Sequence, residues 1–163
     1  YLTLNTDTQE LAYVLKPKET NAPDFLINAL KEGNRVQDIF TNNFKQGVTG
    51  NQILRKSLEQ GIAEGLRPSI YTHPLGTYGH SAGTTLGMWD SQGGVPFSGD
   101  YPLQYNTAYA IELNTTVYIP EWEKDIRIML EVPGFFGKDG FRYIKGRQTE
   151  YILVGKKLEG LAD

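Results

Sequence analysis

The spacing of apolar residues predicts a strand and two amphipathic helices in the first half of the chain. Residues 1–15 alternate between apolar and polar side chains, a pattern typical of a strand pair or a bent strand. Apolar residues then recur at helical spacing over residues 22–47. A second helix is predicted after Thr49, which forms the pattern of a capping box with Gln52, and it extends to Pro68.

The second half of the chain has a different pattern, an irregular segment followed by strands. Residues 73–100 are rich in Gly, Ser, Thr and Pro, and a connection of this length is typically either functional or disordered. Residues 108–119, 126–132 and 141–154 are rich in β-branched and aromatic side chains, which predicts sequential strands. This order of elements indicates an α+β domain in which helices cover one face of an antiparallel sheet.

Composition narrows the classes of function. With a formal net charge of −3 and no basic run that would follow phosphates, we expect no nucleic-acid partner. No apolar run approaches the roughly 18–20 residues that span a bilayer, so we expect a soluble chain without a membrane partner, either cytoplasmic or exported. Because cysteine is absent, metal ligands would have to be His, Asp and Glu.

Two glutamates stand at strand positions that should share one face of the sheet. In the first predicted strand, the alternation places Glu112 with Asn114 on the face opposite the apolar residues. In the next strand, Glu131 shares a face with Arg127 and Met129. Taken alone, either glutamate is better explained as an exposed residue on a solvent-facing strand, because glutamate is mostly exposed in proteins. Together on adjacent strands they would form a like-charge pair that needs cations between them.

Both histidines of the chain lie in the irregular segment. His73 is followed by Pro74, and His80 is surrounded by glycines at positions 76, 79 and 83. Glycines let a backbone pack tightly beside a site. A single loop histidine is usually only solvated or hydrogen-bonded, so neither residue by itself indicates a ligand.

The order of these residues resembles the pita-bread metallopeptidases, a family that includes methionine aminopeptidase, aminopeptidase P and prolidase. In this family, carboxylate and imidazole ligands hold a pair of metal ions. The matching segments span nearly the whole chain and are Asn5-Thr6-Asp7-Thr8, Gly79-His80-Ser81-Ala82-Gly83, Ala110-Ile111-Glu112-Leu113 and Arg127-Ile128-Met129-Leu130-Glu131. The phrase Tyr71-Thr72-His73-Pro74-Leu75-Gly76 is similar to the Xaa-Pro peptidase branch.

The resemblance implies a fold and a set of site residues. The fold would be a pita-bread fold with a curved antiparallel sheet and helices on one face. The implied metal ligands are Asp7, His80, Glu112 and Glu131. The implied catalytic residues are Glu112 and His73, and the implied substrate-binding residues are His73, Arg127 and Trp89. The reaction would be metal-dependent hydrolysis of Xaa-Pro bonds in peptides with proline at the second position.

The chain also departs from the family pattern. The family has an earlier aspartate ligand, which would lie ahead of Tyr1, so we expect residues 1–163 to be the C-terminal part of one catalytic domain. Such a part would hold at most one weakly bound metal and be inactive by itself. Trp89 stands before Asp90, where the family has a second histidine, and two residues separate the Arg127-Ile128 pair from Glu131.

The same residues suggest which metal ion would bind, whether the chain self-associates and which other functions are possible. Carboxylate and imidazole ligands suit Mn, Zn, Co or Fe, with manganese as the expected ion. We expect a homo-oligomer, because the sheet surface that a missing half would cover must otherwise be exposed. The first alternative is a non-catalytic peptide- or protein-binding module on the same fold. The second, C–N hydrolysis without metals as in creatinase, is disfavoured by the retained ligands.

Overall fold

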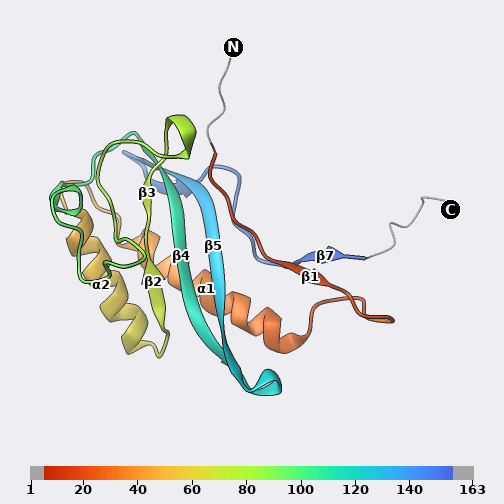
Figure 1. The fold of residues 1–163 in the computed structure, drawn as a ribbon. Helices are drawn as coiled ribbons and strands as arrows, with labels where there is room; N and C mark the ends of the chain where they lie inside the picture. The colour runs from red at the N-terminus through yellow and green to blue at the C-terminus, as the bar shows by residue number, and fades with distance from the viewer. Residues whose placement is uncertain (1–5, 156–163) are drawn as a thin grey trace, which may run out of the picture.

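Two helices pack against one face of a curved antiparallel sheet in the computed structural model, which describes residues 6–155 (Figure 1). Helix α1 (Asp24–Asn42) buries Leu26, Leu30 and Phe40, which recur on one face of the helix, and it packs against the sheet. Neither helix described combines the length and the apolarity that crossing a bilayer requires.

Helix α2 (Gly50–Ala63) confirms the predicted capping box. The side chain of Thr49 accepts a hydrogen bond from the backbone N–H of Gln52, and the side chain of Gln52 accepts one from the backbone N–H of Thr49. The helix ends at Ala63, earlier than predicted, because Gly65 adopts a positive φ of 82° and turns the chain toward Pro68.

The sheet is built around one long hairpin. Strand β4 (Thr107–Ile119) pairs with β5 (Lys124–Gly137) in antiparallel register, and a 3₁₀ turn at Pro120–Trp122 joins them. Strand order is β2-β4-β5-β6, and β3 also pairs with β4. The three short strands are β2 (Pro68–Ile70), β3 (His73–Pro74) and β6 (Gly140–Tyr143).

The predicted separation of faces in β4 is confirmed. Tyr109, Ile111 and Leu113 are buried in the core. Because side chains alternate along a strand, Glu112 and Asn114 lie on the opposite face of the sheet. The helices therefore cover the apolar face, and the polar face is left for a site.

The predicted strand over residues 141–154 is wrong as a single element. It divides into β6 and β7 (Ile152–Val154), and β7 pairs in parallel with β1 (Ala12–Val14) in a separate sheet. Polar side chains between them bond elsewhere: Arg147 donates to Asp38 of α1, and Gln148 bonds the backbone of Leu11. These bonds draw the chain away from the main sheet.

The N-terminal prediction is confirmed only in part. Of the strand expected over residues 1–15, the structure forms β1, and Gln9 makes an isolated antiparallel bridge with Glu131. Residues 1–5 of this prediction lie outside the described residues. The two shortest strands of the main sheet, β2 and β3, were not predicted, because two or three residues show no measurable alternation.

Candidate metal centre

The centre of the site is a pair of glutamates directly opposite one another on adjacent strands. In the β4–β5 register, Glu112 pairs with Glu131. Side chains at such positions have Cβ atoms about 4.5–5.5 Å apart, and like charges there are destabilising. Glu131 is buried and Glu112 is half-buried. The hairpin alone thus holds two carboxylates at a distance suited to a shared cation.

Short strand β3 brings His73 to these glutamates. His73 pairs with Ala110 on β4, two residues from Glu112. The hydroxyl of the buried Thr72 bonds both backbone groups of Glu112, accepting from its N–H and donating to its carbonyl oxygen, each at 3.0 Å. These two hydrogen bonds fix the residue before β3 relative to the backbone of Glu112.

Asp7 reaches the site because its segment is joined to β5. The backbone N–H of Gln9 donates to the carbonyl of Glu131 at 3.0 Å, and the N–H of Glu131 donates to the carbonyl of Gln9 at 3.1 Å. Gly79 lies against Asp7: a Cβ at Gly79 would be 3.1 Å from Oδ2 of Asp7. A glycine at this position, with φ of 85°, permits the close approach.

The imidazole of His73 lies among three carboxylates. Its Nε2 atom is 3.6 Å from Oε2 of Glu112, 3.8 Å from Oδ2 of Asp7 and 4.0 Å from Oε1 of Glu131. These distances are too long for hydrogen bonds, and Nε2 is buried without a partner among the described residues. Nδ1 lies 3.1 Å from the carbonyl oxygen of Pro74. If Nδ1 carries the proton, that bond leaves Nε2 as the free donor atom for a ligand.

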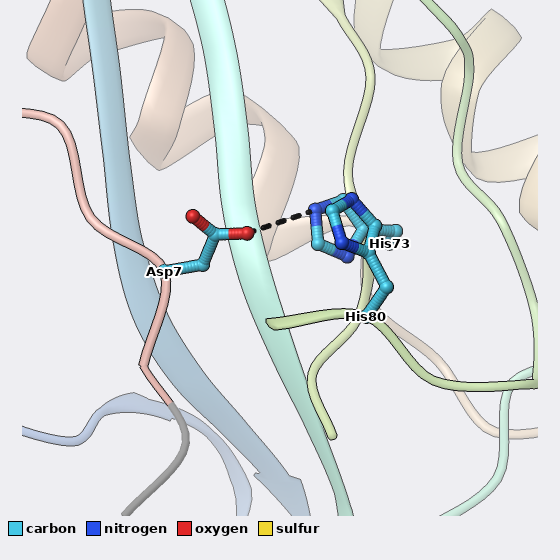
Figure 2. Close-up of side chains that lie close together, drawn as sticks. All are labelled: Asp7, His73 and His80. Atoms are coloured by element: carbon cyan, nitrogen blue, oxygen red, sulfur yellow. Dashed lines mark ion pairs between the residues drawn. The ribbon is translucent and has the colours of Figure 1, made fainter. Parts of the chain in front are cut away.

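His80 joins the site from the other side of His73. The two imidazole rings stack with centroids 4.0 Å apart and an interplanar angle of 16°. Figure 2 shows the stacked rings facing Asp7, with the ion pair drawn from Asp7 to His73. His80 is exposed and lies within reach of a metal shared with Asp7 and His73.

Burial and the neighbouring charges shift the pKa values of Glu131 and His73. Burial raises the pKa of Glu131 to about 7, and the negative charges of Glu112 and Asp7 contribute in the same direction. Burial alone would lower the pKa of His73, but the neighbouring Glu112, the Pro74 carbonyl and Asp7 together raise it above its usual value. The carboxylates repel one another, so a cation at their centre would relieve the repulsion.

The residues fit a divalent metal ion. Two overlapping groups, Asp7 with His73 and His80, and His73 with Glu112 and Glu131, each offer ligand atoms within 4.8 Å of one another. Carboxylate oxygen and imidazole nitrogen are donors for Mn, Fe, Co and Zn. The buried Nε2 atom of His73, which lacks a partner, is the observation that most directly indicates a ligand.

A groove extends from the site along the polar face of the sheet. Its volume is about 940 Å³, and it is lined by His73, His80 and Glu112 at one end. The predicted substrate-binding residues Arg127 and Trp89 also line it. Tyr71 and Asn114 line the same groove, and sequence reasoning gave them no role. The sequence could have indicated Asn114, because strand alternation places it on the same face as Glu112. It could not have indicated Tyr71, because the short strands on either side of Tyr71 were not predicted.

Solved structures that match the fold of this chain identify its architecture. An X-Pro aminopeptidase from Thermotoga maritima matches with a TM-score of 0.63 and 17% identity, over 91% of this chain and 37% of that one. The chain has the pita-bread fold. The dipeptidase PepE from Mycobacterium ulcerans shares this pita-bread arrangement, with a TM-score of 0.58, 18% identity and coverage of 90% and 35%.

A third pita-bread match is an Xaa-Pro dipeptidase from Bacillus anthracis, with a TM-score of 0.52, 20% identity and coverage of 90% and 37%. The chain therefore spans about a third of the length of each matched structure. No family model and no curated protein matches the sequence. At these identities the likeness shows the fold, and the predicted roles of individual residues remain predictions.

Proposed function

We propose that this chain contributes a divalent-metal centre to the hydrolysis of peptide bonds that precede proline. The observation that carries the proposal is the position of His73 Nε2, buried without a partner and within 4.0 Å of the carboxylates of Asp7, Glu112 and Glu131. Solved structures of the same fold include an X-Pro aminopeptidase and an Xaa-Pro dipeptidase, which supports this class of substrate.

The three carboxylates and one imidazole would hold the metal. The sequence resemblance gave the imidazole role to His80 and a substrate-facing role to His73. The geometry favours His73, because its Nε2 approaches all three carboxylates, whereas His80 belongs only to the group with Asp7. We therefore propose His73 as the principal imidazole ligand and the stacked His80 as its support or as a ligand shared with Asp7.

A bound divalent metal would supply Lewis acidity at the scissile carbonyl and lower the pKa of water. The chain itself would provide the rest. Glu112, which is half-buried and lines the groove, would accept the proton of the attacking water. The groove beside it would hold the peptide in an extended conformation along β4 and β5. Trp89 and Met88 would cover apolar side chains of the substrate.

We expect manganese to bind and turnover by this chain alone to be low. The described residues form metal-ligating groups around a single cluster, whereas the resemblance implies a second metal with a further aspartate. The charge of the carboxylates would then be only partly balanced, which weakens the hold on one ion.

Calorimetric titration with Mn²⁺ after dialysis against EDTA tests the proposal. We expect one saturable binding event, abolished in Glu112→Gln and retained in Glu121→Gln, a control at the exposed end of the hairpin. Cleavage of Ala-Pro, assayed with saturating Mn²⁺, should require Glu112. Absence of Mn²⁺, Zn²⁺, Co²⁺ and Fe²⁺ binding, together with retained peptide binding, would contradict the proposal and favour a non-catalytic binding module.

A further inference from the structure

The segment that carries Asp7 is joined to the main sheet at an isolated bridge. Gln9 and Glu131 exchange backbone hydrogen bonds there, of 3.0 and 3.1 Å. Among residues 6–155, no other backbone–backbone hydrogen bond holds residues 6–10. Segments with so few hydrogen bonds open more readily than the rest of a fold. The position of Asp7 therefore depends on what fixes the chain on the far side of the bridge.

A side-chain amide fixes the chain just beyond the bridge. The Oε1 atom of Gln148 accepts a hydrogen bond from the N–H of Leu11 at 2.8 Å, and its Nε2 atom donates to the carbonyl oxygen of Leu11 at 2.7 Å. The same carbonyl accepts the N–H of Ile152, where the pairing of β1 with β7 begins beside the main sheet (Figure 1). Gln148 thus forms an amide clamp, which satisfies both backbone groups of Leu11 as a neighbouring strand would.

Gln148 is itself held by helix α1. The Nδ2 atom of Asn34 donates to the carbonyl oxygen of Gln148 at 2.9 Å and to Oε1 of Gln37 at 3.1 Å. Arg147 donates to the carbonyl oxygen of Asn34 at 3.2 Å. Asn34 and Gln37 are buried, so leaving either amide without a partner would be unfavourable. A chain of hydrogen bonds therefore runs from a core helix through Gln148 to Leu11.

The amide clamp lies near enough to Asp7 to control the position of its carboxylate. Leu11 and Asp7 stand at equal separations on either side of Gln9, and two residues of extended chain span about 7 Å. If Leu11 shifts, the chain can pivot about the bridge, and Asp7 moves by a comparable distance. Oδ2 of Asp7 lies 3.8 Å from Nε2 of His73. Metal–ligand distances vary by only about 0.2 Å in a formed site, so a small displacement would remove Asp7 as a ligand.

We propose that Gln148 is a positioning residue of the metal centre, because its clamp on Leu11 holds Asp7 in place against Glu131. The role of Asp7 as a ligand rests on the proposed function, whereas the attachment of its segment can be measured without metal. Closure of the clamp and occupancy of the centre then stabilise one another, because coupling between two such events is reciprocal.

Amide hydrogen exchange in EDTA, followed by NMR, tests the attachment of the segment. Gln148→Met keeps the length of the side chain and removes both hydrogen bonds to Leu11. We expect the bridge amides of Gln9 and Glu131 to exchange about tenfold faster in this variant, because the bridge opens more often. Rates are compared with those of the α1 amides, which report opening of the whole fold.

Gln92 offers a matched control. Its amide bonds both backbone groups of Ile70, at 2.9 and 2.8 Å, and also donates to the carbonyl oxygen of Met88. Gln92→Met therefore removes the same kind of clamp, and one further hydrogen bond, from a segment that does not carry Asp7. This variant should leave exchange at Gln9 and Glu131 unchanged relative to the α1 amides.

Binding of metal ions tests the consequence for the site. Calorimetric titration with Mn²⁺ should show about a tenfold loss of affinity in Gln148→Met and less than about a twofold loss in Gln92→Met. Gln148→Glu, which keeps the bond from the N–H of Leu11, should lie between Gln148→Met and the wild type. Saturating Zn²⁺, which is diamagnetic, should in turn slow exchange at Leu11 and Gln9 in the wild type.

The outcomes separate the role of Gln148 from the proposed function. Unchanged exchange at Gln9 and Glu131 in Gln148→Met, or equal losses of Mn²⁺ affinity in Gln148→Met and Gln92→Met, would overturn the inference. If Gln148→Met does not fold, Gln148→Glu decides the same comparisons. A wild type that binds no Mn²⁺, with faster exchange at the bridge in the Gln148 variants, would support the clamp and contradict only the proposed function.

Discussion

Glu112 and Glu131 lie directly opposite one another across β4 and β5, on the face that the helices leave uncovered. This pairing of like charges is unfavourable in the absence of a cation. It links the stability of the metal-free protein to its capacity to bind metal, because the same repulsion that weakens the fold attracts the ion.

Glu131→Gln should therefore stabilise the metal-free protein and remove its response to metal. Relief of the repulsion should contribute about 1 kcal/mol, which raises the melting temperature by about 2–4 °C for a chain of this size. Addition of Mn²⁺ should then raise the melting temperature of the wild type but not of the variant. Thermal unfolding followed by circular dichroism, with and without EDTA, measures both effects. A variant that melts lower than the wild type in EDTA would contradict the idea.

The stability of the metal-free protein should fall as pH rises from about 4.5 to about 7. The Glu131 carboxyl has a pKa of about 7 in the folded protein and near its ordinary value of 4.5 when unfolded, so the folded state holds more protons in this window. The raised pKa of His73 acts in the same direction, because its contribution is lost as pH passes that pKa.

We expect the fall to be about 1–3 kcal/mol and to shrink in Glu131→Gln. Urea unfolding in EDTA at several pH values measures it. A stability that rises across this range in the wild type would show that other groups dominate.

The two histidines should differ in their effect on metal affinity. His73→Ala removes the nitrogen that lies among all three carboxylates and should abolish measurable binding of Mn²⁺. His80→Ala removes the stacked ring and should weaken binding about 10–100-fold, as expected for a supporting group. Calorimetric titration of both variants decides between them. If His80→Ala abolished binding and His73→Ala only weakened it, the assignment made from the sequence, in which His80 is the ligand, would be correct.

Thr72→Val should destabilise the protein by about 1–3 kcal/mol, because both bonds to the backbone of Glu112 are lost and the N–H of Glu112 loses its partner, while the carbonyl oxygen keeps the N–H of Tyr71. Thr115→Val is a matched control. Thr115 is equally buried, and its hydroxyl has no partner among residues 6–155, so the change should be neutral or slightly stabilising. Urea unfolding compares the two. Equal costs would show that the hydroxyl of Thr72 does not position Glu112.

Gly79→Ala should weaken metal binding as well as stability. Both Gly79 and Gly65 have a positive φ, of 85° and 82°, so alanine at either costs about 1 kcal/mol. At Gly79 the new Cβ would also lie 3.1 Å from Oδ2 of Asp7, whereas at Gly65 it would meet no atom within 4 Å. Titration with Mn²⁺ should therefore show a loss of affinity only for Gly79→Ala. Equal affinity in both variants would show that Asp7 does not need its observed position.

Several features of the fold and the site could be predicted because they depend on local pattern. The alternation along one strand places Glu112 opposite the apolar face, and the same rule places Glu131 on its strand. The capping box at Thr49 needs only four consecutive residues, so its prediction also held. Each of these follows from geometry within a single element.

Other features depend on which distant segments meet. The segment with Arg147 and Gln148 was predicted as strand from its flanking β-branched and aromatic residues, but its polar side chains bond α1 and Leu11 instead. No periodicity within residues 141–154 contains that information. Long-range hydrogen bonds decided the path of the chain.

The sequence by itself determined the two helices, the apolar face of the hairpin and the set of chemically able residues. Only the tertiary structure decided that His73 lies nearer the carboxylates than His80. The reason is that β3 has two residues, too few to show a pattern, and its place beside Ala110 is set by backbone bonds to β4. The position of an imidazole on so short a strand is a property of the sheet that it joins.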